Sequence, residues 1–269
     1  MKGIRINLTG ATRLNIILGD PIAQVKSPDS VTQAFTDRGH DGLLAPVQVG
    51  VEDLDAFFSV ADRLKNLDGI IVTVPHKFAC FLHCITASER ADFLGAVNIM
   101  RRRPEGGWHG DMMDGLGFVG ALRRQGYSPD GKRALLVGAG GAGSAIGLAL
   151  IEAGVRELAI HDEDTKRRDD LTTRLNGLGR AKILSGSPNP SGFDLVAHAT
   201  PAGMRPGDPL PIEVAKLALE TFVGCVITGP TVSPLIAAAR ARGCPTSTGA
   251  EMSQALQSAM VDFLLHIAP

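Results

Sequence analysis

A glycine-rich segment near the middle of the chain has the residue types and spacing of a dinucleotide-binding turn. Residues 138–143 (GAGGAG) fit the pattern G-x-G-x-x-G, follow the apolar run 134–137 and open an alanine-rich stretch. In this setting Gly138 permits a tight turn, Gly140 lets the backbone approach a pyrophosphate, and Gly143 lets a helix pack closely against a strand. Backbone N–H groups at the helix start would bind the phosphates. The predicted phosphate-binding turn comprises Gly138, Ala139, Gly140, Gly141, Ala142 and Gly143. The alternative is a turn that merely needs small residues.

A carboxylate follows the next apolar strand, at about the 20-residue distance that such sites show. Asp162 could accept hydrogen bonds from the adenosine ribose hydroxyls and would repel a 2′-phosphate, which favours NAD over NADP. Lys166, Arg167 and Arg168 follow and could reach a phosphate, so NADP is the alternative cofactor. We interpret this basic run as a solvated helix face and predict NAD. A simple helix cap is the alternative role of Asp162.

Lys77 and Asp114 are the candidate acid–base residues. Lys77 follows the β-branched run 69–74, just beyond the carboxyl end of a predicted parallel strand, where open α/β sheets bind ligands. A lysine in a closing cleft loses solvation and could exchange a proton with an alcohol while hydride leaves the carbon. Asp114, at the start of a predicted helix, could orient that lysine. From spacing alone, surface charge is the alternative for both residues. His76 is a rival base, although a histidine beside a lysine is more often incidental.

The four cysteines do not form a metal-binding pattern. Cys80 and Cys84 could share one face of a helix, but they lack the two-residue spacing and the second pair of a zinc site. We therefore predict no metal, and we interpret the cysteines as buried free thiols in a reducing cytoplasm.

Alternating strand and helix patterns predict an α/β fold with mainly parallel sheets. In the first part, strands are expected at 14–19, 47–49 and 69–74, and helices over 53–64, over 77–84 and after Ser27, which has the type of an N-cap. From residue 133 a second strand–turn–helix series begins, with strands expected in 156–164, 193–204 and 222–230. Residues 103–113 have an irregular pattern, 114–125 are expected to form a linking helix, and 251–266 the last helix.

Composition and charge exclude several classes of protein. The chain has 269 residues, of which 44% are hydrophobic and 20% charged, and its formal net charge is -1. A disordered chain would be less apolar, and a nucleic-acid-binding protein would carry a basic surplus. No apolar run is long enough to span a membrane. We therefore expect a cytoplasmic protein with a small-molecule substrate, acting as a monomer or homodimer, without nucleic acid or membrane partners.

Six ordered segments resemble the shikimate/quinate dehydrogenase family over nearly the whole chain. They are GDPI (19–22) with Ser27 and Pro28, VTVPHK (72–77), GAVN (95–98), DGLG (114–117), the glycine turn, and TPAGM (200–204). No single segment would be specific, but their order and spacing together are. Pro230 with 233–235, and Gly249 with Met252, add a weaker match.

The resemblance implies two α/β domains, with a Rossmann-type NAD-binding domain over 114–245. The discontinuous substrate-binding domain would comprise 1–113 with a returning helix in 246–269. Lys77 and Asp114 would be the catalytic pair. Ser27, Thr73 and Asn98 would touch the substrate, with Val25 and Met113 also lining its site. The remaining cofactor contacts would come from Thr200, Ala202, Met204, Ile227, Gly249 and Met252.

Several family positions carry less polar residues in this chain. Val25 stands where the family has one of two carboxylate-binding serines, Ile71 where it has asparagine, and Met112–Met113 where it has asparagine–threonine. Thr228 replaces a tyrosine, and Leu256 falls where a substrate-binding glutamine is expected, with Gln257 as a neighbour. Each lost donor would cost about 1–3 kcal/mol of binding. We therefore predict weak activity on shikimate, with quinate or a less polar relative as substrate.

Two functions from different classes remain open. The first is an NAD-dependent dehydrogenase that acts on a shikimate- or quinate-like cyclic alcohol. The second is a catalytically weak paralogue that binds NAD and has a sensing or regulatory role; the intact Lys77 and Asp114 argue against it.

Overall fold

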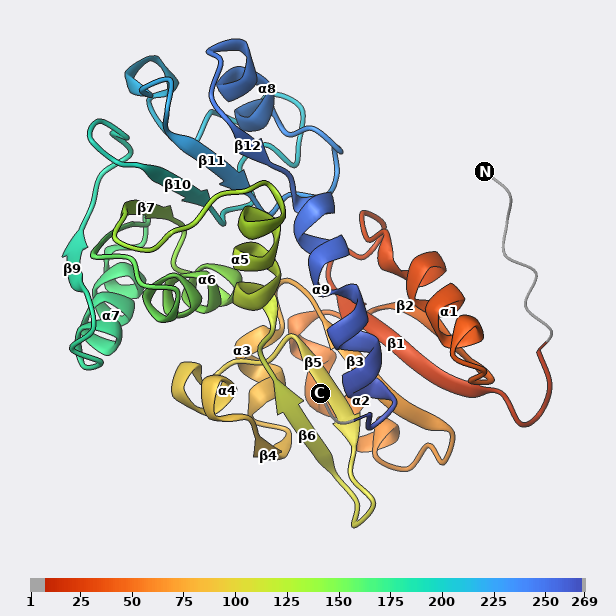
Figure 1. The fold of residues 1–269 in the computed structure, drawn as a ribbon. Helices are drawn as coiled ribbons and strands as arrows, with labels where there is room; N and C mark the ends of the chain where they lie inside the picture. The colour runs from red at the N-terminus through yellow and green to blue at the C-terminus, as the bar shows by residue number, and fades with distance from the viewer. Residues whose placement is uncertain (1–7, 268–269) are drawn as a thin grey trace. The chain divides into compact units, whose positions relative to one another are not determined.

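The computed structural model describes residues 8–267 of the chain. It divides into two compact units. One unit contains the chain up to Met113 together with the chain from Gln257 onwards, and the other is Asp114–Leu256. Figure 1 shows both units, each of them an α/β structure. Among the described residues, no helix combines the length and apolar character needed to cross a membrane.

The first unit is built on a sheet with the strand order β2-β1-β3-β5-β6-β4 within the described residues. Strands β1, β2 and β3 are parallel, β5 is antiparallel to both β3 and β6, and β4 is parallel to β6. The strands are β1 (Arg13–Gly19), β2 (Gly42–Gln48), β3 (Leu67–Val72), β4 (Cys84–Ala87), β5 (Ile99–Arg102) and β6 (Trp108–Asp111). The helices are α1 (Ser27–Asp37), a 3-10 turn η1 (Val51–Asp53), α2 (Leu54–Ala61), α3 (Lys77–Phe81) and α4 (Glu89–Leu94).

This topology gathers the predicted substrate residues at one edge of the sheet. The carboxyl ends of β1, β3 and β6 lie at that edge, together with the amino end of the antiparallel β5. Buried apolar residues such as Leu18 and Ile70, each 0% exposed, hold β1 and β3 in the centre of the unit. The loops that leave these strands are therefore anchored on a packed core.

The second unit is an all-parallel sheet with the order β12-β11-β10-β7-β8-β9 in the described part of the chain. Its strands are β7 (Arg133–Val137), β8 (Glu157–His161), β9 (Lys182–Ser185), β10 (Leu195–His198), β11 (Phe222–Cys225) and β12 (Thr246–Ser247). Its helices are α5 (Asp114–Arg124), α6 (Gly141–Glu152), α7 (Thr165–Asn176), a 3-10 turn η2 (Val214–Lys216), α8 (Pro234–Ala241) and α9 (Gly249–Leu264), whose last part belongs to the first unit. The predicted α/β class and mainly parallel sheets are confirmed.

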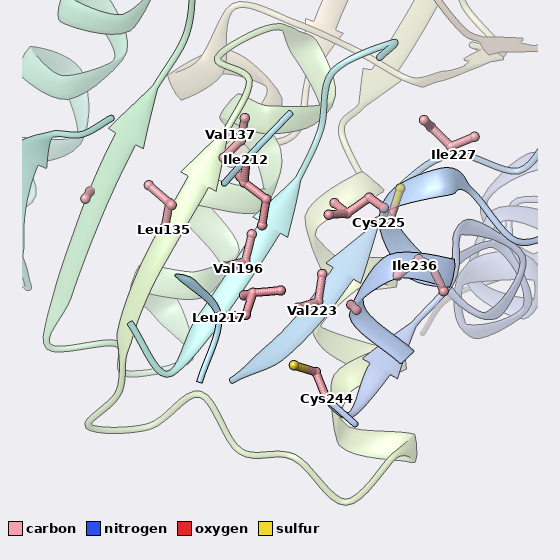
Figure 2. Packing of buried hydrophobic residues seen from close by; sticks show 13 residues of the cluster. Leu135, Val137, Val196, Ile212, Leu217, Val223, Cys225, Ile227, Ile236 and Cys244 are labelled. Atoms are coloured by element: carbon pink, nitrogen blue, oxygen red, sulfur yellow. The ribbon is translucent and has the colours of Figure 1, made fainter. Parts of the chain in front are cut away.

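Apolar side chains from neighbouring strands form the core of the second unit (Figure 2). Leu135, Val196 and Val223 come from β7, β10 and β11, and Ile236 packs against them from α8. Strands buried on both faces carry continuous apolar runs, which is why these segments were recognisable in the sequence.

Three local expectations were wrong. Residues 103–113 are not simply irregular, because β5 and β6 form an antiparallel hairpin whose turn contains Gly106 and Gly107, both with positive φ. Ser27 is the first residue of α1 rather than its N-cap, which is Lys26. The helix predicted over 77–84 ends at Phe81, and Cys84 begins β4, so the two cysteines do not share a helix face.

Candidate active site

The loop that carries Lys77 is held by two backbone hydrogen bonds to neighbouring segments. Lys77 opens α3, and its carbonyl accepts a hydrogen bond of 2.9 Å from the N–H of Val97. The Thr73 N–H donates to the Leu18 carbonyl at 2.9 Å, which ties the end of β3 to the end of β1. The loop therefore has a defined backbone path, with the half-buried Lys77 side chain at the sheet edge described above.

His76, the rival base, is 1% exposed. Its Nε2 lies 2.7 Å from the Val49 carbonyl, and a carbonyl only accepts, so Nε2 carries the proton. The ring thus links the Lys77 loop to the chain that follows β2. Its buried Nδ1 has no hydrogen-bond partner among the described atoms.

Asn98 has a structural contact that the sequence did not reveal. Its side-chain Oδ1 accepts a 2.8 Å hydrogen bond from the N–H of Met113, and its carbonyl accepts one of 2.7 Å from Val72. At 3% exposure, Asn98 connects the end of β3 to the segment that leads into Asp114.

An ion pair between Asp111 and Arg90 fixes the backbone at Met112, one residue before Met113. Sequence reasoning missed this pair. Asp111 is 4% exposed, and its carboxylate accepts both a Met112 N–H (2.7 Å) and the Arg90 Nε–H (2.8 Å). Arg90 Nη2 and the Ser88 hydroxyl also donate to it. The N–H groups of the two methionines before Asp114 are therefore both held by buried side chains. Asp114 itself is 8% exposed and lies in the first turn of α5, where the helix dipole favours a carboxylate.

The less polar residues at family positions are largely buried. Ile71, Met112 and Met113 are 5%, 1% and 6% exposed, while Val25 and Ser27 are half-buried near the start of α1. Leu256 is 5% exposed. The neighbouring Gln257 donates from Nε2 to the Ser30 carbonyl of α1 at 2.7 Å, so its amide is already engaged.

The glycine turn meets the steric requirements of a phosphate cradle. Gly138 has a φ of 106°, in the region that favours glycine, and its N–H donates to the His161 carbonyl. A Cβ on Gly143 would lie 1.9 Å from the Gly138 carbonyl oxygen, so strand and helix touch there. A Cβ on Gly140 would meet no atom within 4 Å, and no side chain caps α6. The start of α6 is therefore open to an anion on the side where Gly140 lies. The glycine turn and the start of α6 thus fit the pyrophosphate of a dinucleotide.

Asp162 closes this turn against the end of β8. Its carboxylate accepts N–H donors from Ala139 (2.7 Å) and Asp164 (2.9 Å). The cap of α7 is Asp164, whose side chain accepts the Arg167 N–H, so the alternative role of Asp162 as helix cap is not observed. Because each carboxylate oxygen has two lone pairs, Asp162 keeps capacity for further donors.

The basic run beyond Asp162 is paired with acids of the same segment. Lys166 lies 2.6 Å from Asp170, Arg168 lies 2.8 Å from Asp169, and Arg167 lies 3.3 Å from Asp164. Arg167 also approaches Asp162 at 3.8 Å. The three basic side chains are therefore paired with neighbouring carboxylates. They do not form a cluster of unpaired positive charge that would bind a 2′-phosphate.

A buried polar chain positions the Thr200 hydroxyl. The Ser233 hydroxyl accepts the Ile236 N–H and donates to Cys225 Sγ (3.3 Å), which lies 3.2 Å from His198 Nδ1. His198 Nε2 lies 2.6 Å from Thr200 Oγ1. Burial lowers the pKa of His198 to about 4, so the ring is neutral and carries one proton.

The tautomer of His198 sets the direction of these hydrogen bonds. If the Cys225 thiol donates to Nδ1, then Nε2–H donates to Thr200 Oγ1, which also accepts the Ala202 N–H at 3.2 Å. In that arrangement Thr200 Oγ1 accepts two hydrogen bonds, and its hydroxyl proton is available for donation to another group. The sequence marked Thr200 but gave no sign of His198 or Cys225, because they are distant in the chain or hidden in strands.

The other predicted cofactor residues lie at several places in the second unit. Ile227 is 4% exposed, and Met204 packs against the same core cluster. Gly249 begins α9, where a Cβ would lie 2.4 Å from the carbonyl oxygens of Val226 and Ile227. Met252, on the same helix, is 8% exposed. Gly249 is thus required for close packing of α9 on the chain after β11.

No group of three or more metal-ligating side chains occurs within residues 8–267. The cysteines there are free, and burial raises the pKa of Cys84 to about 12 and that of Cys80 further still. Both thiols therefore stay protonated at neutral pH, which makes them poor nucleophiles and metal ligands.

Comparison with known proteins identifies the family. The model of the shikimate dehydrogenase substrate-binding domain matches residues 17–100. A shikimate dehydrogenase (NADP(+)) of Rubrobacter xylanophilus is 35% identical over 247 residues, which cover 90% of this chain and 87% of that protein.

Solved structures agree. Shikimate 5-dehydrogenase of Listeria monocytogenes, in complex with shikimate and NAD, has a TM-score of 0.85 at 26% identity, covering 98% of this chain and 95% of its own. Ligand-free 5-ketofructose reductase of a Gluconobacter strain has a TM-score of 0.81 at 29% identity, covering 95% and 93%. The chain therefore belongs to the shikimate dehydrogenase family of oxidoreductases.

Proposed function

We propose that this protein is an NAD-dependent dehydrogenase that transfers hydride between the nicotinamide and a ring hydroxyl or ketone of a shikimate- or quinate-like cyclic acid. The observation that carries the proposal is the glycine turn, where a Cβ at Gly143 would collide with the Gly138 carbonyl but one at Gly140 would enter open space. The family membership supplies the reaction type. The motif residues Lys77 and Asp114 are both present.

In this proposal Lys77 and Asp114 act together on the reacting oxygen. The bound NAD supplies the hydride acceptor or donor. Lys77 takes the proton from the substrate hydroxyl during oxidation and returns it during reduction. Asp114, in the first turn of α5, orients the Lys77 side chain and stabilises the ammonium group that forms when Lys77 takes the proton. Asn98 and Asp111 fix the backbone that leads to Asp114, so they act as positioning residues.

The residues of the second unit hold and orient the cofactor. N–H groups of the first turn of α6 bind the pyrophosphate, and Gly140 leaves room for it. In the tautomer in which His198 Nε2–H donates to Thr200, the Thr200 hydroxyl acts as a donor to a cofactor oxygen. Ala202, Met204, Ile227, Gly249 and Met252 complete the proposed site.

The proposed substrate site offers fewer side-chain hydrogen-bond donors than the family pattern has. The buried apolar residues Ile71, Met112 and Met113 replace hydrogen-bonding residues of the family. A structurally similar protein is named 5-ketofructose reductase, after a substrate other than shikimate or quinate. Val25 and Leu256 likewise offer no side-chain donor to a carboxylate or a hydroxyl.

Turnover measurements test this assignment. With NAD as acceptor, kcat/KM for shikimate is expected to be about tenfold or more below that for a deoxygenated cyclic acid, because each missing donor costs about 1–3 kcal/mol. The readout is NADH formation over a panel of cyclic hydroxy acids. Efficient shikimate oxidation would contradict the substrate assignment. No hydride transfer with any member of the panel would contradict the proposed function itself.

Cofactor preference rests on the charge around Asp162. Relatives are named NADP(+)-dependent, whereas the similar Listeria structure holds NAD. Here Asp162, with Glu163 and Asp164 next to it, would repel a 2′-phosphate, and Lys166 and Arg168 already pair with acids on their own helix. These observations support NAD as the preferred cofactor.

Replacement of Asp162 by asparagine should shift the preference toward NADP. Asp162→Asn removes the charge and keeps one acceptor oxygen for the Ala139 N–H, so the turn should persist. It gives up the acceptor for the exposed Asp164 N–H. We expect the ratio of kcat/KM for NADP to that for NAD to rise by about tenfold or more, since an approach of like charges costs on the order of 1 kcal/mol or above. The exposed Asp53→Asn is the matched control and should leave the ratio unchanged. An unaltered ratio in Asp162→Asn would remove the basis for the NAD assignment.

A further inference from the structure

The first unit contains a small cavity remote from the Lys77 loop. Its volume is about 190 Å³, and its lining includes Thr86, Arg101, Arg103, Glu105, His109 and His266. Arg101 pairs with Gly69 near the start of β3, whereas Lys77 follows the carboxyl end of that strand. The cavity therefore lies toward the opposite end of the sheet from the proposed catalytic lysine.

The sheet register brings the polar lining together on one face. Arg101 of β5 is directly opposite His109 of β6, and Thr86 of β4 is opposite His109 on the other side. The Thr86 hydroxyl lies 2.9 Å from His109 Nδ1. Arg103, two residues beyond Arg101, continues the same face. Arg102 also lines the cavity, but its guanidinium lies over the Trp108 ring.

The charge of this face is positive. Arg101 and Arg103 contribute two guanidinium groups, and Arg101 is held by the ring and the carbonyl of Phe263. The opposing charge is Glu105, 70% exposed at its side chain and 3.5 Å from Arg103. A pair this exposed is largely screened by water, so it neutralises the cavity only in part.

The two imidazoles report this positive potential. Burial lowers the pKa of His109, and the charges of Arg101, Arg103 and His266 lower it further, while Asp111 opposes them. Burial and the charge of Arg101 likewise lower the pKa of His266. Asp68 and a hydrogen bond to the Arg102 backbone act in the opposite direction and raise it. An anion in the cavity would offset the repulsion that adds to burial in lowering both pKa values.

His266 has an unusual backbone conformation for a non-glycine residue. It follows α9 with a φ of 56°, its N–H donates to the Phe263 carbonyl, and the Ile267 N–H donates to that of Asp262. Glycine is the usual residue at this position of a helix end, because a Cβ is disfavoured there. This chain nevertheless has a histidine at the position, and His266 lines the cavity. Helix termination alone does not explain that choice.

We propose that this cavity is a binding site for a phosphate dianion, either free phosphate or the phosphate group of a small monoester. Its volume is below the roughly 300–1,000 Å³ of sites for larger ligands, which fits a small anion. Guanidinium forks and imidazole N–H groups match the oxygens of a tetrahedral dianion. The site is separate from the proposed dehydrogenase chemistry and does not depend on it.

Calorimetric titration of the full-length protein tests the site. Inorganic phosphate and glycerol phosphate are the probes, and acetate is the control. Saturable binding of either phosphate at millimolar or lower concentration, with acetate at least about tenfold weaker, is the expected result. Tighter binding of glycerol phosphate identifies a monoester ligand, and tighter binding of inorganic phosphate identifies the free ion. Absence of binding, or equal binding of acetate, overturns the proposal.

Three variants separate a binding site from general surface charge. Arg103→Gln should weaken phosphate binding by about tenfold, and Glu105→Gln should strengthen it, since it removes the opposing carboxylate. His266→Gly suits the positive φ, so the protein should unfold at the same or a higher temperature while binding phosphate more weakly. Wild-type affinity in both Arg103→Gln and His266→Gly would overturn the proposal.

The pH dependence provides an independent check with sulfate, which remains a dianion throughout. Bound anion raises the pKa of His109 and His266, so binding takes up protons and should tighten as the pH falls from about 8 to about 5. The charged groups that face these rings are Arg101, Arg103, Glu105, Asp111 and Asp68. Affinity that does not change with pH would contradict imidazole participation and overturn the proposed site.

Discussion

Lys77→Met is expected to lower kcat by about 10²–10⁴-fold, the usual contribution of a positioned acid or base. Methionine is nearly as long as lysine and cannot carry a proton, so the variant removes the chemistry while filling the same half-buried position. The backbone should be retained, because Lys77 contributes its carbonyl rather than its side chain to the bond with Val97. Single-turnover NADH formation would measure the loss.

The affinity for NAD should remain within about twofold, since Lys77 and the glycine turn belong to different compact units. The matched control is Lys65→Met, an exposed lysine of the same unit whose carbonyl accepts from Arg13. It should keep the parent kcat. A Lys77→Met variant that turns over within a few-fold of the parent, or one that loses NAD binding, would show that the lysine has another role.

Gly140→Ala is expected to separate cofactor binding from folding. Its φ of −72° and ψ of −169° suit alanine, and the new Cβ would touch no protein atom. The ligand-free protein should therefore gain about 0.4–1 kcal/mol of unfolding free energy. The NAD dissociation constant should rise by more than about tenfold, because the methyl group would occupy the space left for the pyrophosphate. Urea unfolding and NAD titration measure the two effects.

Gly143→Ala should instead lower the stability of the protein itself, whether or not cofactor is bound. Its Cβ would fall 1.9 Å from the Gly138 carbonyl, so β7 and α6 must move apart. We expect a loss of about 1–3 kcal/mol or more of unfolding free energy even without cofactor. Equal stability of the two alanine variants, or unchanged NAD affinity in Gly140→Ala, would contradict the role given to the turn.

The second unit was the easier part to predict from the sequence. Strand β7, the turn 138–143 and helix α6 follow one another within a single continuous segment. An apolar run buried on both faces, a glycine signature and an alanine-rich helix are all local properties, so the chain order displays them. The turn at Gly106 and Gly107 was equally local. The hairpin was missed because both strands beside it are only four residues long, and β5 ends in two arginines.

The sequence by itself determined the α/β class, the glycine turn and the family, because these depend on residue type, periodicity and spacing along the chain. Only the tertiary structure decided what surrounds each functional residue. The Asp111–Arg90 ion pair, the chain from Ser233 to Thr200, and the cavity beside His266 join residues from separate elements. Such contacts arise from strand register and helix packing, which bring together side chains that no local pattern relates.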